Sequence, residues 1–269
     1  MFWEQAEQVI EQAKANGSLY PIATEAVAIE QNGITYLGHI VAKNSAQRKF
    51  TPKPTADFNP FLPYEQDMFV AEAGEEHVCL LNKFPVITPH LLICSKQFIS
   101  QESPLELEDF AAWLRGFESD NVLGFYNGGP VAGASQAHRH MQLVQSEVPL
   151  EALILSERLP FEHRLYRYHR PSSEKLYISY LAAMREMKLF GSEENNNNKC
   201  KPYNILLTRH WMLVIPRSRN CIEDIFANGM NYSGRFLVKN AEQLEWLKTH
   251  GLLNLLQACA IAKDLEDEC

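Results

Sequence analysis

Hydrophobic positions along the chain recur with two different periods, and each period predicts one kind of element. Apolar residues spaced by three and four predict amphipathic helices, whereas short apolar runs bounded by turn residues predict strands. The predicted helices span 3–15, 107–117, 176–187 and two segments after about residue 241. The predicted strands span 34–41, 77–82, 90–95, 121–126, 138–145, 203–208 and 211–216. Helices and strands are therefore mixed along the chain, which is typical of an α+β fold.

The second of these helices is predicted to begin at a capping motif. Ser103 is the expected N-cap, Pro104 opens the first turn, and Glu106 follows the serine by three residues. The buried stripe is predicted to consist of Leu107, Phe110, Ala111, Leu114 and Phe117. No internal repeat and no long linker divides the chain, so we expect one extended domain over residues 1–269.

The predicted strand 138–145 carries the most informative side chains. His138, His140 and Gln142 occupy every second position, so an extended strand directs all three to the same face. A glycine-rich turn, 128–136, precedes this strand and offers backbone N–H groups that suit a phosphate. Three interpretations of the histidine pair remain open: hydrogen-bonded structural residues, a metal site, or nucleotidyl transfer through a covalent histidine. The glycine-rich turn favours the third.

Four blocks of this sequence resemble, in the same order, the diadenosine tetraphosphate phosphorylases (ATP adenylyltransferases) of the histidine-triad superfamily. The blocks are 59–64, with the sequence NPFLPY; 81–92, with LNKFPVITPHLL; 125–142, which holds FYNGGP and GASQAHRHMQ; and 203–218, which holds YNILLT and VIPRS. The resemblance implies a histidine-triad-like antiparallel sheet with helices over about 34–150. It also implies a C-terminal α/β extension over about 151–269 that packs on this core.

The resemblance further implies cleavage of diadenosine tetraphosphate by inorganic phosphate to ATP and ADP, through an adenylyl-histidine. One alternative is another nucleotidylyltransferase of the superfamily, acting on a sugar 1-phosphate with a uridylyl or adenylyl group. A second is a sensor that binds dinucleotides without catalysis. The sensor is disfavoured because His140 and Gln142 are both present.

By the same resemblance His140 is the nucleophile, and His138 holds the neighbouring backbone and phosphates. Gln142 stands where hydrolytic members carry a third histidine. An amide can donate a hydrogen bond to a phosphate oxygen but cannot take a proton from water, so this residue points to transfer instead of hydrolysis.

Substrate contacts are expected from residues in both halves of the chain. They are Lys49 (with Lys53 as its rival), Asn82, Lys83, Asn127, Gly133, Ala134, Ser135, Gln136, Asn228 and Lys239. An ordinary exposed lysine is the alternative interpretation of Lys83. His90 is interpreted as a hydrogen-bonded structural histidine, because it begins an apolar strand.

Composition limits the partners. The formal net charge of −8 argues against nucleic acid and anionic membranes, and no apolar run is long enough to span a bilayer. The amino end turns polar at once, unlike a signal peptide, and the six cysteines form no C-x-x-C pair. We therefore expect a cytoplasmic enzyme with free thiols and nucleotide and phosphate substrates. No organic cofactor and no protein-held metal are expected; a magnesium ion is expected only on the nucleotide phosphates.

Overall fold

The computed structural model describes residues 1–42, 58–191 and 198–263. Lys49 and Lys53, and one of the six cysteines, Cys269, lie outside these ranges.

An eight-stranded sheet forms the centre of the molecule, and every neighbouring pair of its strands is antiparallel. In spatial order its strands are β3 (Phe69–Glu72), β4 (His77–Leu81), β5 (His90–Ser95), β7 (His140–Gln145), β6 (Val122–Gly128), β9 (Tyr203–Leu207), β10 (Trp211–Pro216) and β8 (Arg164–Arg167). The pairing of β6 with β9 joins the predicted core to the predicted extension. This α+β architecture confirms the fold class predicted from the sequence.

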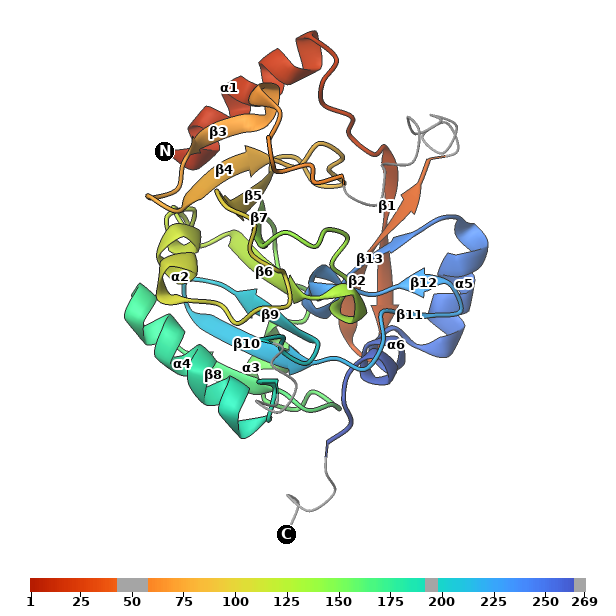
Figure 1. The fold of residues 1–269 in the computed structure, drawn as a ribbon. Helices are drawn as coiled ribbons and strands as arrows, with labels where there is room; N and C mark the ends of the chain where they lie inside the picture. The colour runs from red at the N-terminus through yellow and green to blue at the C-terminus, as the bar shows by residue number, and fades with distance from the viewer. Residues whose placement is uncertain (43–57, 192–197, 264–269) are drawn as a thin grey trace.

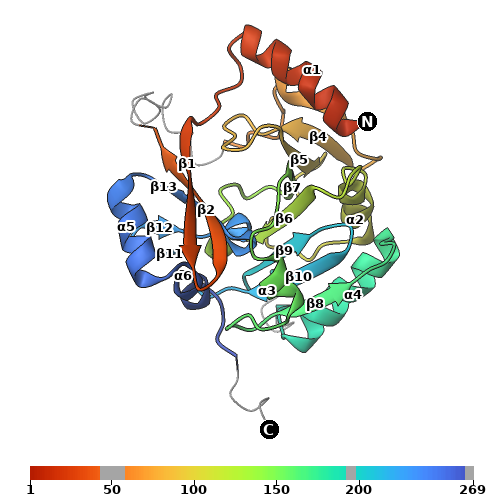
Figure 2. The same cartoon turned by 180° about the vertical axis from the view of Figure 1, so that it is seen from behind.

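A second, three-stranded sheet packs beside the first and also draws on both ends of the chain (Figures 1 and 2). It contains β1 (Thr24–Gln31), β2 (Ile34–Val41) and, parallel to β2, β13 (Arg235–Val238). The helices are α1 (Phe2–Ala15), α2 (Leu107–Leu114), α3 (Glu151–Leu155), α4 (Ser173–Glu186), α5 (Ala241–His250) and α6 (Leu252–Cys259). Short elements complete the fold: 3-10 turns at Gln66–Met68, Pro130–Ala132 and Gly229–Ser233, and the small hairpin β11 (Cys221–Ile222) and β12 (Ile225–Phe226).

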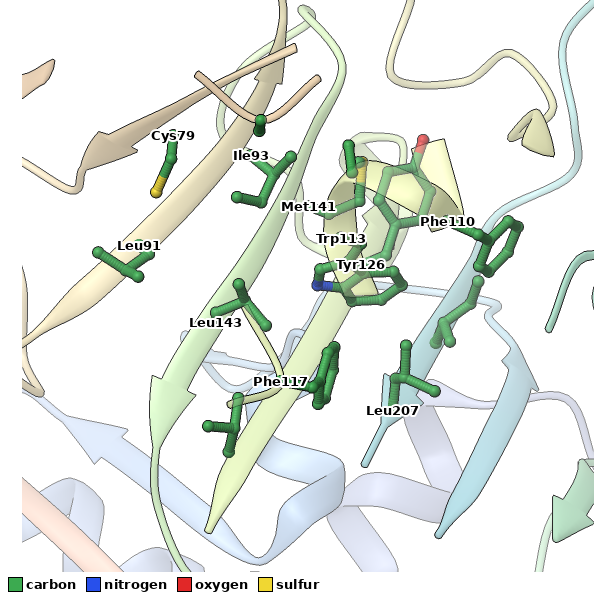
Figure 3. Close-up of a cluster of buried hydrophobic side chains, with 14 of the residues drawn as sticks. Cys79, Leu91, Ile93, Phe110, Trp113, Phe117, Tyr126, Met141, Leu143 and Leu207 are labelled. Carbon is green, nitrogen blue, oxygen red and sulfur yellow. The ribbon is translucent and has the colours of Figure 1, made fainter. Parts of the chain in front are cut away.

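Two hydrophobic cores lie on opposite faces of the large sheet. One core includes Met141 and Leu143 of β7 with Phe110 and Trp113 of α2 (Figure 3). The buried sides of α1 and α4 belong to the same core. The other includes Phe125 and Val144 with residues of α6 and the small sheet. His140 and Gln142 point away from the first core, because side chains alternate along β7. His140 and Gln142 therefore lie on the face of the large sheet that the C-terminal portion covers.

The start of α2 differs from the prediction. Its N-cap is Glu106, not Ser103, and a capping box pairs Glu106 with Asp109. Tertiary contacts explain the shift, because the Pro104 carbonyl accepts from Arg139 (2.6 Å) and the Leu105 N–H donates to the hydroxyl of Tyr180 (3.0 Å). The predicted stripe is also wrong in part: Ala111 is exposed, and Ala112 and Trp113 are buried.

Strands β1, β3, β8, β11, β12 and β13 had no prediction, and β7 begins two residues later than predicted. His138 therefore precedes β7 and forms an isolated bridge with Ser100. Between the two histidines, Arg139 turns to the opposite face and forms a buried ion pair with Asp109 (2.8 Å), which also binds His77 (2.8 Å). This buried network fixes the backbone at the start of β7.

Candidate active site

A cavity of about 310 Å³ lies between β5, β6 and β7 of the large sheet and the segment that leads into β13. Its lining comprises His39, Asn82, Phe84, Val86, Ile87, His90, Phe125, Asn127, Gly133, Ser135, Gln142, Val144, Phe226, Asn228, Met230, Asn231, Arg235, Phe236 and Leu237. Among the described residues that line it there is no carboxylate, and Arg235 is a cation. In a chain with a net charge of −8, this lining suits an anionic ligand with an apolar part.

His140 begins β7 opposite Cys94 of β5 and lies on the same face of the strand as Gln142, which lines the cavity; His140 itself is not among the described lining residues. Its Nδ1 lies 2.8 Å from the His138 carbonyl oxygen. A carbonyl oxygen only accepts, so Nδ1 carries the proton and Nε2 keeps its lone pair. No described group forms a hydrogen bond with Nε2. The peptide of His140 is held as well, because its N–H donates to Gln101 Oε1 (2.8 Å).

The environment of His140 keeps the imidazole neutral. Burial lowers its pKa from 6.5 to about 4, and the hydrogen bond to the His138 carbonyl opposes this shift only in part. The ring of Phe61 packs against it with centroids 5.4 Å apart, and the residue is 4 % exposed. A neutral ring with a free, oriented nitrogen is the form that a nucleophilic histidine requires.

His138 has a different environment. Its Nε2 donates to the Ser95 carbonyl oxygen (2.8 Å), and its Nδ1 lies 2.9 Å from Asn59 Nδ2. The Asn59 Oδ1 accepts from the Phe61 N–H (3.0 Å), so the Nδ2 of Asn59 must be the group that faces His138. Both ring nitrogens of His138 therefore have protein partners. The structure places this residue as a support for the backbone around His140.

Gln142 is oriented by a chain of hydrogen bonds that begins at a backbone N–H. The Phe84 N–H donates to Asn82 Oδ1 (3.0 Å), which turns Asn82 Nδ2 toward His90 Nδ1 (3.1 Å). His90 must then carry its proton on Nε2, which donates to Gln142 Oε1 (3.0 Å). The amide N–H groups of Gln142 are left to face the cavity. Burial lowers the pKa of His90 to about 4, which keeps this ring neutral.

His90 is thus hydrogen-bonded, as interpreted from the sequence, but it also lines the cavity and orients Gln142. This contact could not be predicted from the sequence, because the pairing of Leu92 with Gln142 across β5 and β7 creates it.

Four of the predicted substrate contacts in the glycine-rich turn and the C-terminal portion meet at one end of the cavity: Asn127, Gly133, Ser135 and Asn228. The approach is close, because a Cβ added to Gly133 would lie 2.5 Å from the Cβ of Asn228. Gly133 also has a φ of +94°, which favours glycine. Asn82 and Gln142 belong to the same cavity, whereas Ala134 and Gln136 lie in the turn without lining it.

Two predicted lysines are not among the described residues that line the cavity, although Asn82 and Phe84, on either side of Lys83, belong to the lining. Lys83 forms an ion pair with Glu65 (2.7 Å), and Lys239 is exposed just before α5. Lys49 falls in the undescribed range. The positions of Lys83 and Lys239 match ordinary surface lysines more closely than phosphate ligands.

Several residues at the site had no prediction. Asn59, Phe61 and Gln101 hold the two histidines, and His39 and Arg235 line the cavity from the small sheet. Asn59 and Phe61 stand in the first of the four resembling blocks, which was the available signal. Neither Gln101 nor Arg235 stands in any of these blocks.

Metal and membrane features are absent from the described ranges. Within them, no three His, Cys, Asp or Glu side chains gather in a way that could hold a metal ion. The helices of residues 1–42, 58–191 and 198–263 include none with the length and apolar character needed to cross a bilayer. The five described cysteines are free thiols, as predicted.

Family models match nearly the whole chain. The Ap4A phosphorylase N-terminal domain matches residues 1–166, and the ATP adenylyltransferase C-terminal domain matches residues 157–262. The chain therefore belongs to the Ap4A phosphorylase family of nucleotidyltransferases. This confirms the resemblance inferred from the four blocks.

Individual relatives come from Saccharomyces cerevisiae. The chain is 27 % identical to diadenosine 5',5'''-P1,P4-tetraphosphate phosphorylase 2, over 87 % of this chain and 86 % of the relative. It is 30 % identical to Protein APA1, over 67 % of this chain and 68 % of that protein. The crystal structure of yeast Ap4A phosphorylase Apa2 superposes with a TM-score of 0.83 and 23 % identity, covering 99 % of this chain and 96 % of the other. A complex of Apa2 with Ap4A superposes with a TM-score of 0.81, 23 % identity and 98 % coverage of both chains.

Proposed function

We propose that this protein cleaves diadenosine tetraphosphate with inorganic phosphate to give ATP and ADP, through an adenylyl group carried on His140. The observation that supports it most directly is the hydrogen bond from His140 Nδ1 to the His138 carbonyl, which leaves a neutral ring with a lone pair on Nε2. The yeast relative named as a diadenosine tetraphosphate phosphorylase supports the choice of substrate.

In the first step His140 Nε2 attacks the α-phosphorus of one adenosine. The new P–N bond forms as the bond between this phosphorus and the bridging oxygen breaks, and ATP leaves with the electron pair on that oxygen. The ring becomes an imidazolium, whose Nδ1–H remains bonded to the His138 carbonyl. The amide N–H groups of Gln142 and Asn127 are placed to donate to the phosphate oxygens, where charge accumulates in the transition state.

In the second step an oxygen of inorganic phosphate attacks the adenylyl phosphorus. The P–N bond breaks, ADP forms, and His140 returns to its neutral state. Phosphate is already ionised, so no protein base has to remove a proton from it before it attacks. Water would require such a base. Gln142 cannot accept a proton from water, and the free-amide face that it presents supports transfer over hydrolysis.

The proposal includes the partners and the location. A magnesium ion would arrive with the nucleotide phosphates as part of the substrate, and no organic cofactor takes part. Free thiols at the five described cysteines support a cytoplasmic protein. Small-molecule substrates (diadenosine tetraphosphate, ATP, ADP and inorganic phosphate), rather than nucleic acid, suit the net charge of −8.

Product analysis tests the function. The pure protein is incubated with diadenosine tetraphosphate, with and without phosphate, and the nucleotides are separated. Turnover that rises with phosphate and yields ATP with ADP is expected. Full-rate cleavage without phosphate, yielding ATP with AMP, would show a hydrolase and contradict the interpretation of Gln142.

A further inference from the structure

Asn204 of β9 and Arg217, just after β10, belong to the fourth resembling block, yet neither lines the active-site cavity. Both are buried: Asn204 is 0 % exposed and Arg217 is 3 % exposed. A buried guanidinium is costly unless its charge and all its N–H groups are compensated. Its partners therefore indicate why the fold keeps it.

All five N–H groups of Arg217 have acceptors. Nε donates to the Cys259 carbonyl (2.9 Å), and Nη2 donates to the carbonyls of Arg219 (2.7 Å) and Ala227 (3.0 Å). Nη1 donates to the Ala132 carbonyl (3.3 Å) and to the side-chain oxygen of Asn204. No described carboxylate pairs with it; the ring of Tyr232 lies 5.0 Å from its Cζ instead. The group thus remains a cation solvated by neutral oxygens.

The polarity of the next residue follows from this contact. Arginine only donates, so the atom of Asn204 that meets Nη1 must be the oxygen. The Nδ2 of Asn204 then donates to Asn127 Oδ1 (2.8 Å) and to the Ala132 carbonyl (2.9 Å).

Asn127 is held from two sides. Its Oδ1 accepts from Asn204 and also from the Gly229 N–H (2.8 Å), which is a backbone donor and cannot be reversed. The Nδ2 of Asn127 has no partner among the described residues, and Asn127 lines the cavity. Its N–H groups are therefore available to an oxygen atom of a ligand.

The same guanidinium sets the distance between the two walls of the cavity. Ala132 precedes Gly133 in one wall, and Ala227 precedes Asn228 in the other, and Arg217 binds both carbonyls. Glycine at 229 completes the fit, because a Cβ there would lie 2.9 Å from Asn127 Oδ1.

We propose that Arg217 and Asn204 are positioning residues that clamp the two walls together and fix the amide of Asn127 as a donor to a substrate phosphate. The identity of that phosphate rests on the proposed function; the orientation of the amide does not. Arg217 contributes its charge behind the glycine-rich turn, where it favours an anion without touching it.

Asn127→Asp tests the orientation. The aspartate keeps an oxygen for Asn204 and Gly229 but turns a second oxygen, instead of N–H, to the cavity. We expect the melting temperature to stay close to that of the wild type, while the affinity for AMP, measured by calorimetry, falls by roughly a hundredfold. A variant that binds AMP as well as the wild type would overturn the proposal, as would a large loss of stability with binding retained.

Asn204→Asp tests the relay, by which we mean the chain of hydrogen bonds from Arg217 through Asn204 to Asn127. It keeps an oxygen for Arg217 but removes the N–H groups that reach Asn127 and Ala132, so kcat/KM and AMP affinity should fall by roughly ten- to a hundredfold. In the Asn127→Ala background the same change should lower kcat/KM and AMP affinity by less than about threefold, because the Asn127 amide that Asn204 holds is already removed. Full additivity of the two changes would overturn the relay. If Asn204→Asp does not fold, Asn204→Ser is used in the same cycle.

Trp211→Phe is the matched control for lost stability. It removes a partly buried hydrogen bond of the same hairpin, from Trp211 Nε1 to Glu151 (2.8 Å); neither residue lines the cavity. It should lower the melting temperature and leave kcat/KM within about twofold. Because AMP binding is measured without turnover, an inactive wild type that binds AMP would contradict the proposed function and still leave the relay testable.

Discussion

His138 and His140 lie two residues apart and differ in every hydrogen bond that matters for reactivity. Both nitrogens of His138 are used, by the Ser95 carbonyl and by Asn59. His140 uses one nitrogen, on the His138 carbonyl, and keeps the other. Burial lowers the pKa of both rings, so charge does not separate them. The free lone pair on Nε2 does separate them, and it supports His140, not His138, as the proposed nucleophile.

The largest expected effect comes from His140→Ala. Without Nε2 no adenylyl-enzyme can form, so kcat should fall by about 10⁴-fold or more with folding intact. His138→Ala should retain measurable turnover and lose stability by about 1–3 kcal/mol, because it leaves buried partners unpaired. Substrate labelled at the α-phosphate, followed by an alkaline quench that preserves P–N bonds, should label the wild type and not His140→Ala. Equal loss of turnover in the two variants would erase the distinction between the histidines.

Gln142→Leu should have the next largest effect. It removes an amide donor that His90 holds toward the cavity, so kcat should fall by about 10²-fold. The matched variant Gln142→His supplies a titratable group at the end of the same hydrogen-bond chain and should release AMP in the absence of phosphate. Phosphate-independent AMP production by the wild type at the same rate would show that the residue does not select the acceptor.

A pH profile sharpens the comparison further. With a pKa of about 4, His140 is still neutral at pH 5.5, so adenylyl-enzyme should form nearly as fast there as at pH 7. A histidine at its ordinary value of 6.5 would lose about tenfold. The rate is measured in single turnovers without phosphate, since phosphate itself titrates near neutrality. A single-turnover rate that falls with an apparent pKa near 6.5 would show that His140 is in contact with solvent.

Stability should follow pH in a defined direction. Because the folded pKa of His140 and of His90 is lowered, the unfolded chain binds more protons between pH 6.5 and about 4. The contribution of these two histidines to the free energy of unfolding is therefore fully present above pH 6.5 and is lost as the pH drops to about 4. Urea midpoints at several pH values, compared with those of His140→Gln, measure this contribution. A urea midpoint that increases as the pH drops from 6.5 to about 4 would contradict this prediction.

Lys83→Ala should have the smallest effect. Its ammonium is already paired with Glu65 at the surface, so its removal should change stability by less than about 1 kcal/mol. The four-block resemblance predicts that the variant binds substrate more weakly. The structure, in which Lys83 pairs with Glu65 and does not line the cavity, predicts a change in KM of no more than about threefold. Glu65→Gln, which frees the ammonium, is the control. A tenfold rise in KM for Lys83→Ala alone would show that the lysine moves to the phosphates when substrate binds.

The sequence alone determined the parts of this protein that depend on local order. The alternation His138-Arg139-His140-Met141-Gln142 places two polar side chains of β7 on one face of a strand, whatever surrounds it. Hydrophobic period located α1, α4 and most central strands, because each buries one continuous face. The four blocks identified the family and five of the residues that line the cavity, Asn82, Asn127, Gly133, Ser135 and Gln142.

Tertiary structure decided which of these residues can react and which only support. The cap of α2 moved to Glu106 because Pro104 and Leu105 bond to distant side chains, an effect that no local pattern encodes. His90 reaches Gln142 only through strand pairing. Arg217 joins Ala132 to Ala227 across 95 positions of chain. Such contacts depend on the packing of residues far apart in the sequence, and that packing is fixed only when the whole core is formed.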